Sequence, residues 1–317
     1  MTAAERQRCV VVGYGVQGHK RHAIAGADAV AIVDPVAKDA DAKDIRDMPL
    51  KLYDAALVCT PDAAKYELLA YLLANGKHVL VEKPLFAADD KELLHLQELA
   101  RQSGAVCYTA YNHRFEPHFL RMRDAIAAGD LGRIYSLRMF YGNGTARLVR
   151  ESGWRDRGAG VLPDLGSHLI DTLLFWLPDA RTWSFQIRSA QRHENAAFDH
   201  VLIDAAPPAG PLIQLEMMLL SWRNHFTADV FAERGSAHIE SLCKWGPSEF
   251  IRRRRILPSG RPPEERVVLV QDDPTWAAEY EHFLGLCEKA EPCSLANDLW
   301  LNQVLRNLAH DAGVTAG

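Results

Sequence analysis

Short apolar runs alternate with longer amphipathic segments through the first 112 residues. The pattern predicts strands at "CVVV", "AVAIVDP", 55–61, 77–84 and 105–112, and helices after the first strand, at 62–75 and at 88–103. Repeated strand–helix units of this size are typical of a parallel sheet with helices on both faces. We therefore expect a Rossmann-type, doubly wound domain over residues 1–112.

The pattern changes from about residue 113. Strands are predicted at 132–142, 181–189, 198–206, 211–220, 227–233, 236–241, 249–257 and 265–271, and helices at 163–177, 276–289 and 295–311. Short connections such as "PPAGP" and "RGS" join several of these strands, which indicates hairpins. The fold class predicted for the chain is α/β, with a second, α+β domain over residues 113–317 built on a large, mainly antiparallel sheet. The last helix is an additional candidate for packing back on the first domain.

One face of this second sheet is expected to be covered by helices. Segments such as "IQLEMMLLSW" give the other face apolar side chains, and the predicted elements leave no helix to cover it. Large uncovered apolar faces usually meet another subunit. We expect a homodimer or homotetramer formed through this face.

Composition and charge exclude several classes of protein. The chain has 317 residues, 48% of them hydrophobic, and a net charge of −5, which gives no general case for nucleic acid or an anionic membrane as partner. No apolar run approaches the roughly 20 residues of a membrane helix. The six cysteines are far apart and form no C-x-x-C motif, so reduced thiols and a cytoplasmic location are expected. No metal site is predicted.

A glycine motif follows the first strand directly. Gly13, Gly15 and Gly18 form G-x-G-x-x-G between a strand and a helix. In such a motif the glycines allow a tight turn, approach of the backbone to a pyrophosphate, and close packing of helix on strand. The predicted cofactor contacts in this turn also include Tyr14, Val16 and Gln17.

The second strand ends in Asp34, about 20 residues after the turn, where an acid accepts hydrogen bonds from an adenosine ribose. Asp34 would repel a 2′-phosphate. No arginine follows it, and Lys38 is the only cation close in sequence. The predicted cofactor is NAD, with NADP less favoured.

Further candidate residues follow the next strands. Ligands of parallel sheets bind beyond the carboxyl ends of the strands, which places Thr60-Pro61 and Glu82-Lys83 beside the cofactor. Lys83 precedes a proline, which favours an extended backbone. Its ammonium either pairs with Glu82 or polarises a reacting hydroxyl and stabilises its alkoxide.

A polar stripe crosses the predicted helix at 163–177. Asp164, His168 and Asp171 recur at i, i+4 and i+7, which places them on one helix face among leucines. A solvated face or a carboxylate at the helix start would explain an isolated stripe of this kind. An imidazole that titrates near neutrality also suits proton transfer.

Six strings occur together in a recognisable order: "GYGVQG", "VDP", "CTPD", "GKHVLVEKP", "YNHRFEP" and "GAGVLPDLGSHLIDT". In order and spacing, over nearly the whole chain, they resemble the Gfo/Idh/MocA oxidoreductases. The resemblance implies that Lys83, Asp164 and His168 are catalytic. His168 would be the general base, Asp164 its orienting partner and a substrate contact, and Lys83 the alkoxide stabiliser. Asp171 would have a structural or supporting role.

The substrate is less well defined by the sequence. Segments 111–123 and 147–160 are basic and aromatic, and the predicted substrate contacts in them are Asn112, Arg114, Trp154 and Arg155. Arginines suit phosphate, although ordinary pairing with Glu116, Glu151 and Asp156 would also explain them. In "IRRRR" (251–255), successive side chains point to opposite faces of a strand and cannot form one patch.

The string from Trp154 onward resembles family members that oxidise UDP-N-acetylglucosamine (UDP-GlcNAc) at C3 in amino-sugar and lipopolysaccharide biosynthesis. This nucleotide sugar is the specific substrate predicted. The alternatives are a free sugar or inositol dehydrogenase, a non-catalytic NAD-dependent sensor, and an NAD-dependent glycosidase. The lysine and the D-x-x-x-H motif together argue against the last two.

Overall fold

The chain forms two compact units. The computed structural model describes residues 7–87, 89–153, 155–289 and 294–315. The first unit comprises Met1–Asn112 and Trp276–Asn302, and the second His113–Thr275 and Gln303–Gly317. The sequence pattern assigned all of residues 113–317 to the second domain, and only the last helix was expected to be able to pack back on the first domain. Residues 276–302 instead belong to the first unit, and the second boundary falls within α8 (Ala296–Asp311).

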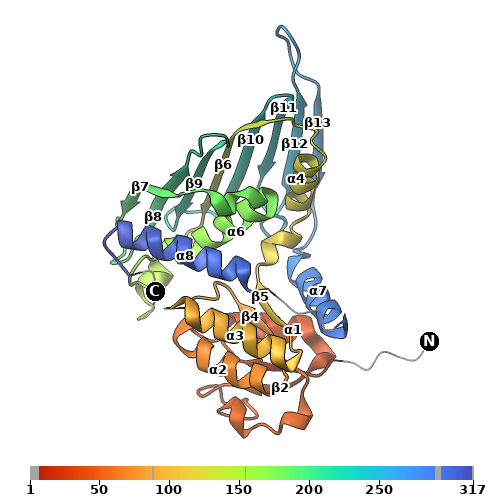
Figure 1. Ribbon diagram of the computed structural model, residues 1–317, viewed down its shortest axis with the longest axis vertical. Helices are drawn as coiled ribbons and strands as arrows, with labels where there is room; N and C mark the ends of the chain where they lie inside the picture. The colour runs from red at the N-terminus through yellow and green to blue at the C-terminus, as the bar shows by residue number, and fades with distance from the viewer. Residues whose placement is uncertain (1–6, 88, 154, 290–293, 316–317) are drawn as a thin grey trace, which may run out of the picture. The chain divides into compact units, whose positions relative to one another are not determined.

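A five-stranded parallel sheet forms the centre of the first unit, as predicted (Figure 1). Its strands lie in the order β2-β1-β3-β4-β5. They are β1 (Cys9–Val12), β2 (Ala29–Val33), β3 (Ala55–Val58), β4 (His78–Glu82) and β5 (Cys107–Ala110). β1 coincides with its predicted run, and the other four strands are shorter than theirs because those runs include loop residues at the strand ends. The parallel order brings the carboxyl ends of β1 to β4 to one edge of the sheet.

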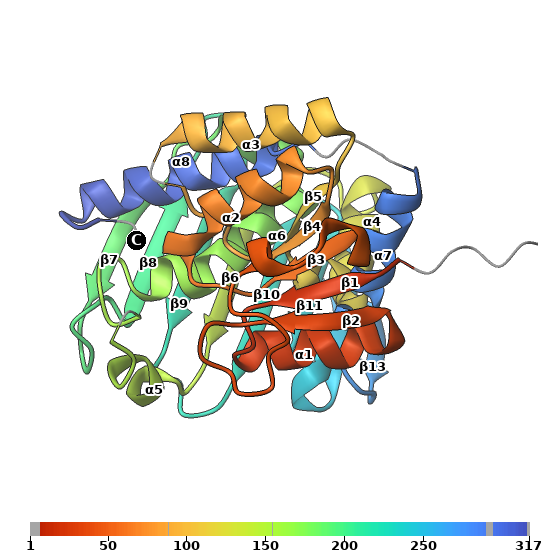
Figure 2. The same ribbon diagram turned by 90° about the horizontal axis from the view of Figure 1, so that it is seen from below.

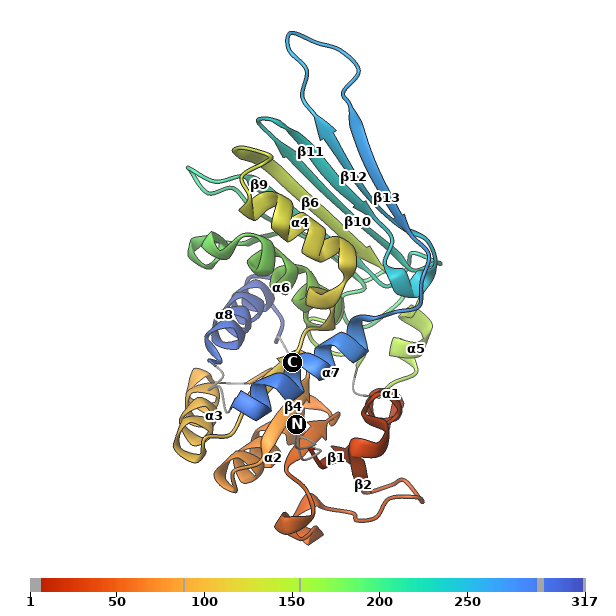
Figure 3. The ribbon, with the colours of Figure 1, turned by 90° about the vertical axis from the view of Figure 1, so that its right-hand side faces the viewer.

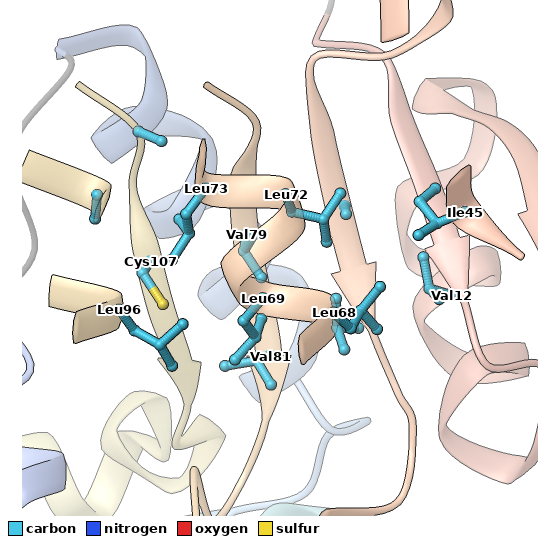
Figure 4. Packing of buried hydrophobic residues seen from close by; sticks show 14 of the residues in the cluster. Val12, Ile45, Leu68, Leu69, Leu72, Leu73, Val79, Val81, Leu96 and Cys107 are labelled. Atoms are coloured by element: carbon cyan, nitrogen blue, oxygen red, sulfur yellow. The ribbon is translucent and has the colours of Figure 1, made fainter. Parts of the chain in front are cut away.

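Helices cover both faces of this sheet. Figure 2 shows α2 (Asp62–Ala74) and α3 (Asp90–Ser103) on one face and α1 (Val16–Ala25) on the other. Leucines of α2 pack against Val79 and Val81 of β4 (Figure 4). On the α1 face, Tyr280 and Phe283 of α7 (Thr275–Lys289) join a core with Val11. Burial of these aromatic side chains explains why α7 belongs to the first unit.

The second unit is built on an eight-stranded sheet in the order β13-β12-β11-β10-β6-β9-β8-β7. The strands are β6 (Ile134–Gly142), β7 (Gln186–Gln191), β8 (His200–Ala205), β9 (Leu212–Met218), β10 (His225–Ala232), β11 (Gly235–Glu240), β12 (Ser248–Arg254) and β13 (Glu264–Leu269). β6 and β9 are parallel and the other neighbours antiparallel, so the mainly antiparallel sheet is confirmed. The strand predicted at 181–189 starts only at Gln186, because Pro178–Thr182 form a 3₁₀ turn.

Helices lie on one face of the large sheet. Figure 3 shows α4 (Pro117–Ala127) and α6 (Ser167–Trp176) on that face. The sequence pattern missed α4, which begins with proline at its first position, and the short α5 (Ala146–Arg150). Among the described residues, no helix has the length and apolar character needed to cross a bilayer.

The other sheet face is less apolar than predicted. Ile213, Leu215 and Met217 of "IQLEMM" are buried, whereas Gln214 and Glu216 alternate with them on the opposite side. That opposite face carries ion pairs between neighbouring strands, including Arg188–Asp204, His200–Glu216 and Arg266–Glu249. Apolar side chains such as Phe140, Leu202 and Phe231 lie among them. The expectation of a predominantly apolar face was therefore wrong, because strand alternation divides each apolar run between two faces.

Oligomerisation through this mixed face stays a prediction. Light scattering at micromolar concentration should give a mass of at least two 35.4 kDa chains. Phe231→Glu, which adds a charge at a half-exposed position of the face, should lower that mass. A 35 kDa species alone for the unmodified protein would contradict the prediction.

A buried histidine makes the second unit sensitive to acid. His118 of α4 is fully buried and its ring stacks on that of Phe250. Burial lowers the pKa of His118 below its ordinary value of 6.5. The unfolded chain then binds a proton more readily than the folded one, so His118 favours folding above pH 6.5 and this contribution is lost as the pH falls further.

The free energy of unfolding should therefore decrease between pH 7 and pH 5 in urea titrations. His118→Leu should reduce that decrease, because leucine does not titrate. His310→Gln is the control, since the His310 side chain is 91% exposed. An equal pH dependence in the His118→Leu variant and the unmodified protein would show that His118 is not responsible.

Candidate active site

The glycine turn after β1 is sterically restricted. Gly13 has φ of 88°, and a Cβ atom there would lie 2.8 Å from the Cys59 carbonyl oxygen. A Cβ on Gly18 would lie 2.0 Å from the Gly13 carbonyl oxygen, so α1 can approach β1 only with glycine at this position. Space around Gly15 is open. This is the arrangement that lets a pyrophosphate approach the start of a helix, and the turn therefore fits NAD.

Asp34 closes the turn from the second strand. Its carboxylate accepts hydrogen bonds from the backbone N–H groups of Tyr14 (2.7 Å), Val36 (2.8 Å) and Ala37 (2.7 Å). Partial burial alone would raise the pKa of Asp34, but these donors outweigh it and hold the pKa below its ordinary value. Lys43 also lowers this pKa, so it is a nearby cation that the sequence reading, which considered only Lys38, missed. A charged carboxylate at this position suits a ribose hydroxyl rather than a 2′-phosphate.

The remaining predicted cofactor residues of the first unit lie near the same edge. The Thr60 Cγ2 atom lies 3.2 Å from the position of a Cβ on Gly13. Pro61 precedes α2, and Lys83 follows the last residue of β4. Glu82 forms an ion pair with Arg21 of α1, with 2.7 Å between Arg21 Nε and Glu82 Oε1. Within the first unit the structure thus brings together the glycine turn, Asp34 and Thr60, and holds Glu82 by a partner that the sequence reading missed.

Two of the three residues of the polar stripe in the second unit, His168 and Asp171, are buried, and Asp164 is partly exposed. The predicted helix from Pro163 begins as a π-helical turn (Leu162–Gly166) and continues as α6. His168 is 8% exposed and Asp171 2%. A solvated helix face is therefore excluded for these two residues. Local π-helical turns are frequent at functional sites.

His168 belongs to a cluster of aromatic and imidazole rings. The His113 ring stacks on it with centroids 4.0 Å apart and planes 20° apart, and the Tyr141 ring centroid lies 6.0 Å away. Lys244 adds a cation, with Nζ 3.4 Å from His113 Nε2 and 4.8 Å from the Trp245 ring centroid. The sequence reading missed these contacts, because β6 and the turn at Cys243–Trp245 lie far from His168 in the chain.

The charge of Lys244 is little compensated. Within the described residues, no carboxylate lies within the 4.0 Å that defines an ion pair with its Nζ. Desolvation lowers the pKa of Lys244, and the more distant carboxylates of Asp273 and Glu116 oppose that shift. The side chain nevertheless remains exposed to solvent. An ammonium of this kind is available to a ligand bound near His168.

The two arginines predicted to bind phosphate both face carboxylates. Arg114 forms two hydrogen bonds with Asp171, one of them 2.9 Å from Nε to Oδ2. Arg155 Nη2 lies 3.0 Å from Asp164 Oδ2. These partners are residues of the polar stripe rather than the surface acids considered from the sequence. Asp171 is thus paired with Arg114 and Asp164 with Arg155, and the roles predicted for the two carboxylates stay predictions.

The other predicted substrate residues give less information. Asn112 is buried, and Trp154 lies outside the described residues. Two further arginines of segment 147–160, Arg147 and Arg150, pair with Glu151 and Glu194, respectively. Of the "IRRRR" run, Arg252 pairs with Asp130 and Arg253 with Glu264. In the described ranges, no group of three or more His, Cys, Asp or Glu side chains is arranged to hold a metal ion.

Comparison with protein families defines the relationship of the chain. Residues 7–111 match the model for an oxidoreductase family with an NAD-binding Rossmann fold, and residues 119–238 match the GFO/IDH/MocA C-terminal domain. Together these regions include more than two thirds of the chain. The chain belongs to the Gfo/Idh/MocA oxidoreductase family. The prediction of an NAD-binding Rossmann domain is confirmed.

The similarity to individual proteins of known name is either limited to part of the chain or low in sequence identity. The chain is 31% identical to scyllo-inositol 2-dehydrogenase (NADP(+)) IolW of Bacillus subtilis over 159 residues, which are 48% of this chain and 42% of that protein. The matched region thus spans less than half of this relative. Levoglucosan dehydrogenase in complex with NADH has the same fold, with a TM-score of 0.80, 17% identity and 97% of each chain covered. The structure of UDP-N-acetylglucosamine 3-dehydrogenase GnnA of Acidithiobacillus ferrooxidans is similar to this chain with a TM-score of 0.76 and 18% sequence identity. The match covers 96% of this chain and 97% of that chain.

Cofactor choice is testable at Asp34. Asp34→Ser should weaken NAD binding roughly tenfold or more and relatively favour NADP, because a charge-assisted hydrogen bond and a repulsion are both removed. Asp41→Ser is a matched control, since the Asp41 carboxylate also accepts a backbone hydrogen bond (from Ile32) in the same loop. Fluorescence titrations with the two reduced cofactors measure both affinities. Tenfold tighter binding of NADPH by the unmodified protein would contradict the role given to Asp34.

Proposed function

We propose that this protein is an NAD-dependent dehydrogenase that oxidises a secondary alcohol of a sugar or polyol. One observation carries the proposal above the others. His168, a buried imidazole, stacks on His113 and lies one helical turn after a carboxylate that is itself held by Arg155. Histidine is the side chain used most often as a general base in proton transfer. Membership of the oxidoreductase family supports the same reaction class.

Oxidation of an alcohol removes a hydride from carbon and a proton from oxygen. NAD, when bound, supplies the hydride acceptor. The residues that would hold it are the three glycines of the turn and Asp34. In the proposed reaction His168 takes the hydroxyl proton as the carbon–oxygen bond becomes a carbonyl. Asp164 contacts the substrate and limits the movement of the base.

Lys83 has an electrostatic role in this proposal. Charge develops on the substrate oxygen as the proton leaves, and a fixed ammonium beside that oxygen stabilises it. Lys83 directly follows β4, at the sheet edge where the glycine turn and Asp34 lie. Its place next to a cofactor-binding edge supports this role.

A nucleotide-linked substrate is the second candidate. The specific form of this hypothesis is oxidation of UDP-GlcNAc at C3, and its support is the arginine-rich character of segments 111–123 and 147–160. The pairing of Arg114 with Asp171 and of Arg155 with Asp164 argues against free phosphate-binding arginines. Lys244 is the cation near His168 that is better placed to meet an anionic substrate group.

A substrate panel separates these candidates. Inositols, free hexoses, glucosides and UDP-linked sugars are incubated with NAD, and absorbance of the reduced nicotinamide is followed. Turnover of a neutral sugar or polyol supports the first candidate. Turnover restricted to UDP-linked sugars supports the second, and Lys244→Met should then raise KM more than it lowers kcat. NAD binding without turnover of any alcohol would favour the non-catalytic sensor.

The proposed catalytic residues are tested on the best substrate of that panel. His168→Ala should lower kcat by about 10² to 10⁴ and leave NAD affinity nearly unchanged, because a general base acts only in the chemical step. Lys83→Ala should be comparably damaging, since the alkoxide would form without a cation. His310→Ala is the control. A His168→Ala protein with unchanged kcat, measured where chemistry limits the rate, would contradict the mechanism.

A further inference from the structure

Lys65 is an unusual residue on the buried face of α2. It lies one turn before Leu69, and the buried face continues through Leu72 and Leu73. Lysine is rarely buried without a partner, yet Lys65 is only 2% exposed. A leucine or methionine here would continue the apolar face without desolvating a charge. The first turn of a helix also disfavours a cation. The ammonium therefore depends on specific acceptors.

Those acceptors surround Lys83. Lys65 Nζ donates to the carbonyl oxygen of Glu82 at 2.7 Å and to that of Pro84 at 2.8 Å, and it pairs with Asp62 Oδ1 at 2.6 Å. An ammonium has three N–H donors, and each has an acceptor here. Two of these acceptors are the main-chain carbonyls of the residues on either side of Lys83.

Arg21 holds the same segment through a side chain. The Arg21 guanidinium is buried, lies 4.3 Å from the Trp276 ring centroid and pairs with Glu279 at 2.7 Å. Its Nε donates to Glu82 Oε1. Glu82 is thus held by its carboxylate through Arg21 and by its carbonyl through Lys65. The backbone on both sides of Lys83 is fixed by buried cations.

We propose that Lys65 is a positioning residue for Lys83. By binding the carbonyls of Glu82 and Pro84, it fixes the backbone of Lys83 and hence the direction in which the Lys83 side chain leaves the sheet edge. This inference rests on the proposed function, in which the Lys83 ammonium stabilises an alkoxide. Displacement of a catalytic group by about 1 Å can lower a rate by about 10².

The first experiment compares two lysines of the first unit. Lys65→Met removes the ammonium and keeps an unbranched side chain only one atom shorter. Lys77→Met is the matched control, because Lys77 Nζ also donates to a main-chain carbonyl, that of Tyr53 at 2.7 Å, but lies before the start of β4 rather than after its end. We expect Lys65→Met to lower kcat by roughly 10- to 100-fold with NAD affinity nearly unchanged. Lys77→Met should change kcat by less than about twofold, and Lys65→Arg should retain more activity than Lys65→Met.

A double-mutant cycle tests whether Lys65 acts through Lys83. In a Lys83→Ala background, Lys65→Met should cause little further loss of kcat, because the group that it positions is absent. Additive losses would show that Lys65 acts independently of Lys83 and would overturn the inference.

Hydrogen exchange tests the positioning without any substrate. Amides in a peptide covering residues 79–87 should exchange roughly tenfold faster in Lys65→Met than in the unmodified protein or in Lys77→Met. If the unmodified protein oxidises no alcohol, the proposed function fails, and the exchange result alone decides whether Lys65 holds the segment. Equal exchange in the three proteins, or a melting temperature lowered in Lys65→Met with kcat unchanged, would show that Lys65 contributes only to stability.

Discussion

The close approach of α1 to β1 is the constraint on which the first unit depends. It requires glycine at position 18, where any side chain would collide with the Gly13 carbonyl oxygen. Because α1 lies so near the sheet, Arg21, one turn further along, reaches Glu82 at the end of β4. The close packing at the start of α1 thus also sets the position of Glu82, the residue before Lys83. Cofactor binding and the proposed chemistry share one packing arrangement.

In the second unit, burial rather than backbone geometry organises the candidate site. α6 is buried on nearly all sides, so its polar residues can be tolerated only with partners. The Arg114 guanidinium donates hydrogen bonds to Asp171, and the His113 ring stacks on the His168 ring. These partners come from the segment before α4, and the neighbouring rings come from β6 and the turn after β11. The site therefore forms only when the large sheet and its helices have assembled.

The sequence was sufficient for features that depend on local pattern. Strand–helix alternation predicted the parallel sheet, and the glycine spacing predicted the tight turn between β1 and α1 that the structure shows. It was insufficient where distant residues decide the outcome. The pairing of Arg155 with Asp164, the stacking of His113 on His168 and the place of Lys244 all depend on tertiary contacts. The burial of Lys65 could have been suspected from the sequence, because it occupies an apolar position of α2. A single lysine at such a position can, however, equally extend its ammonium to solvent. The mixed character of the exposed sheet face follows from strand alternation, which places successive residues of each apolar run on opposite faces.

Lys83 and His168 have similar surroundings. Lys83 lies between Glu82, which Arg21 and Lys65 hold, and Pro84, whose carbonyl Lys65 binds. His168 lies between Asp164 and Asp171 on its helix, which Arg155 and Arg114 hold. In each case the carboxylates next to the reacting group are paired with arginines of the same unit. These ion pairs hold the backbone or helix around the reacting group in place. Preorganisation of this kind lowers the reorganisation needed when charge develops on a substrate oxygen. It also leaves Lys244, rather than the paired Arg114 and Arg155, as the cation near His168 with charge to offer a ligand. Substrate selectivity should accordingly depend more on Lys244 and the rings beside it than on arginine recognition of phosphate.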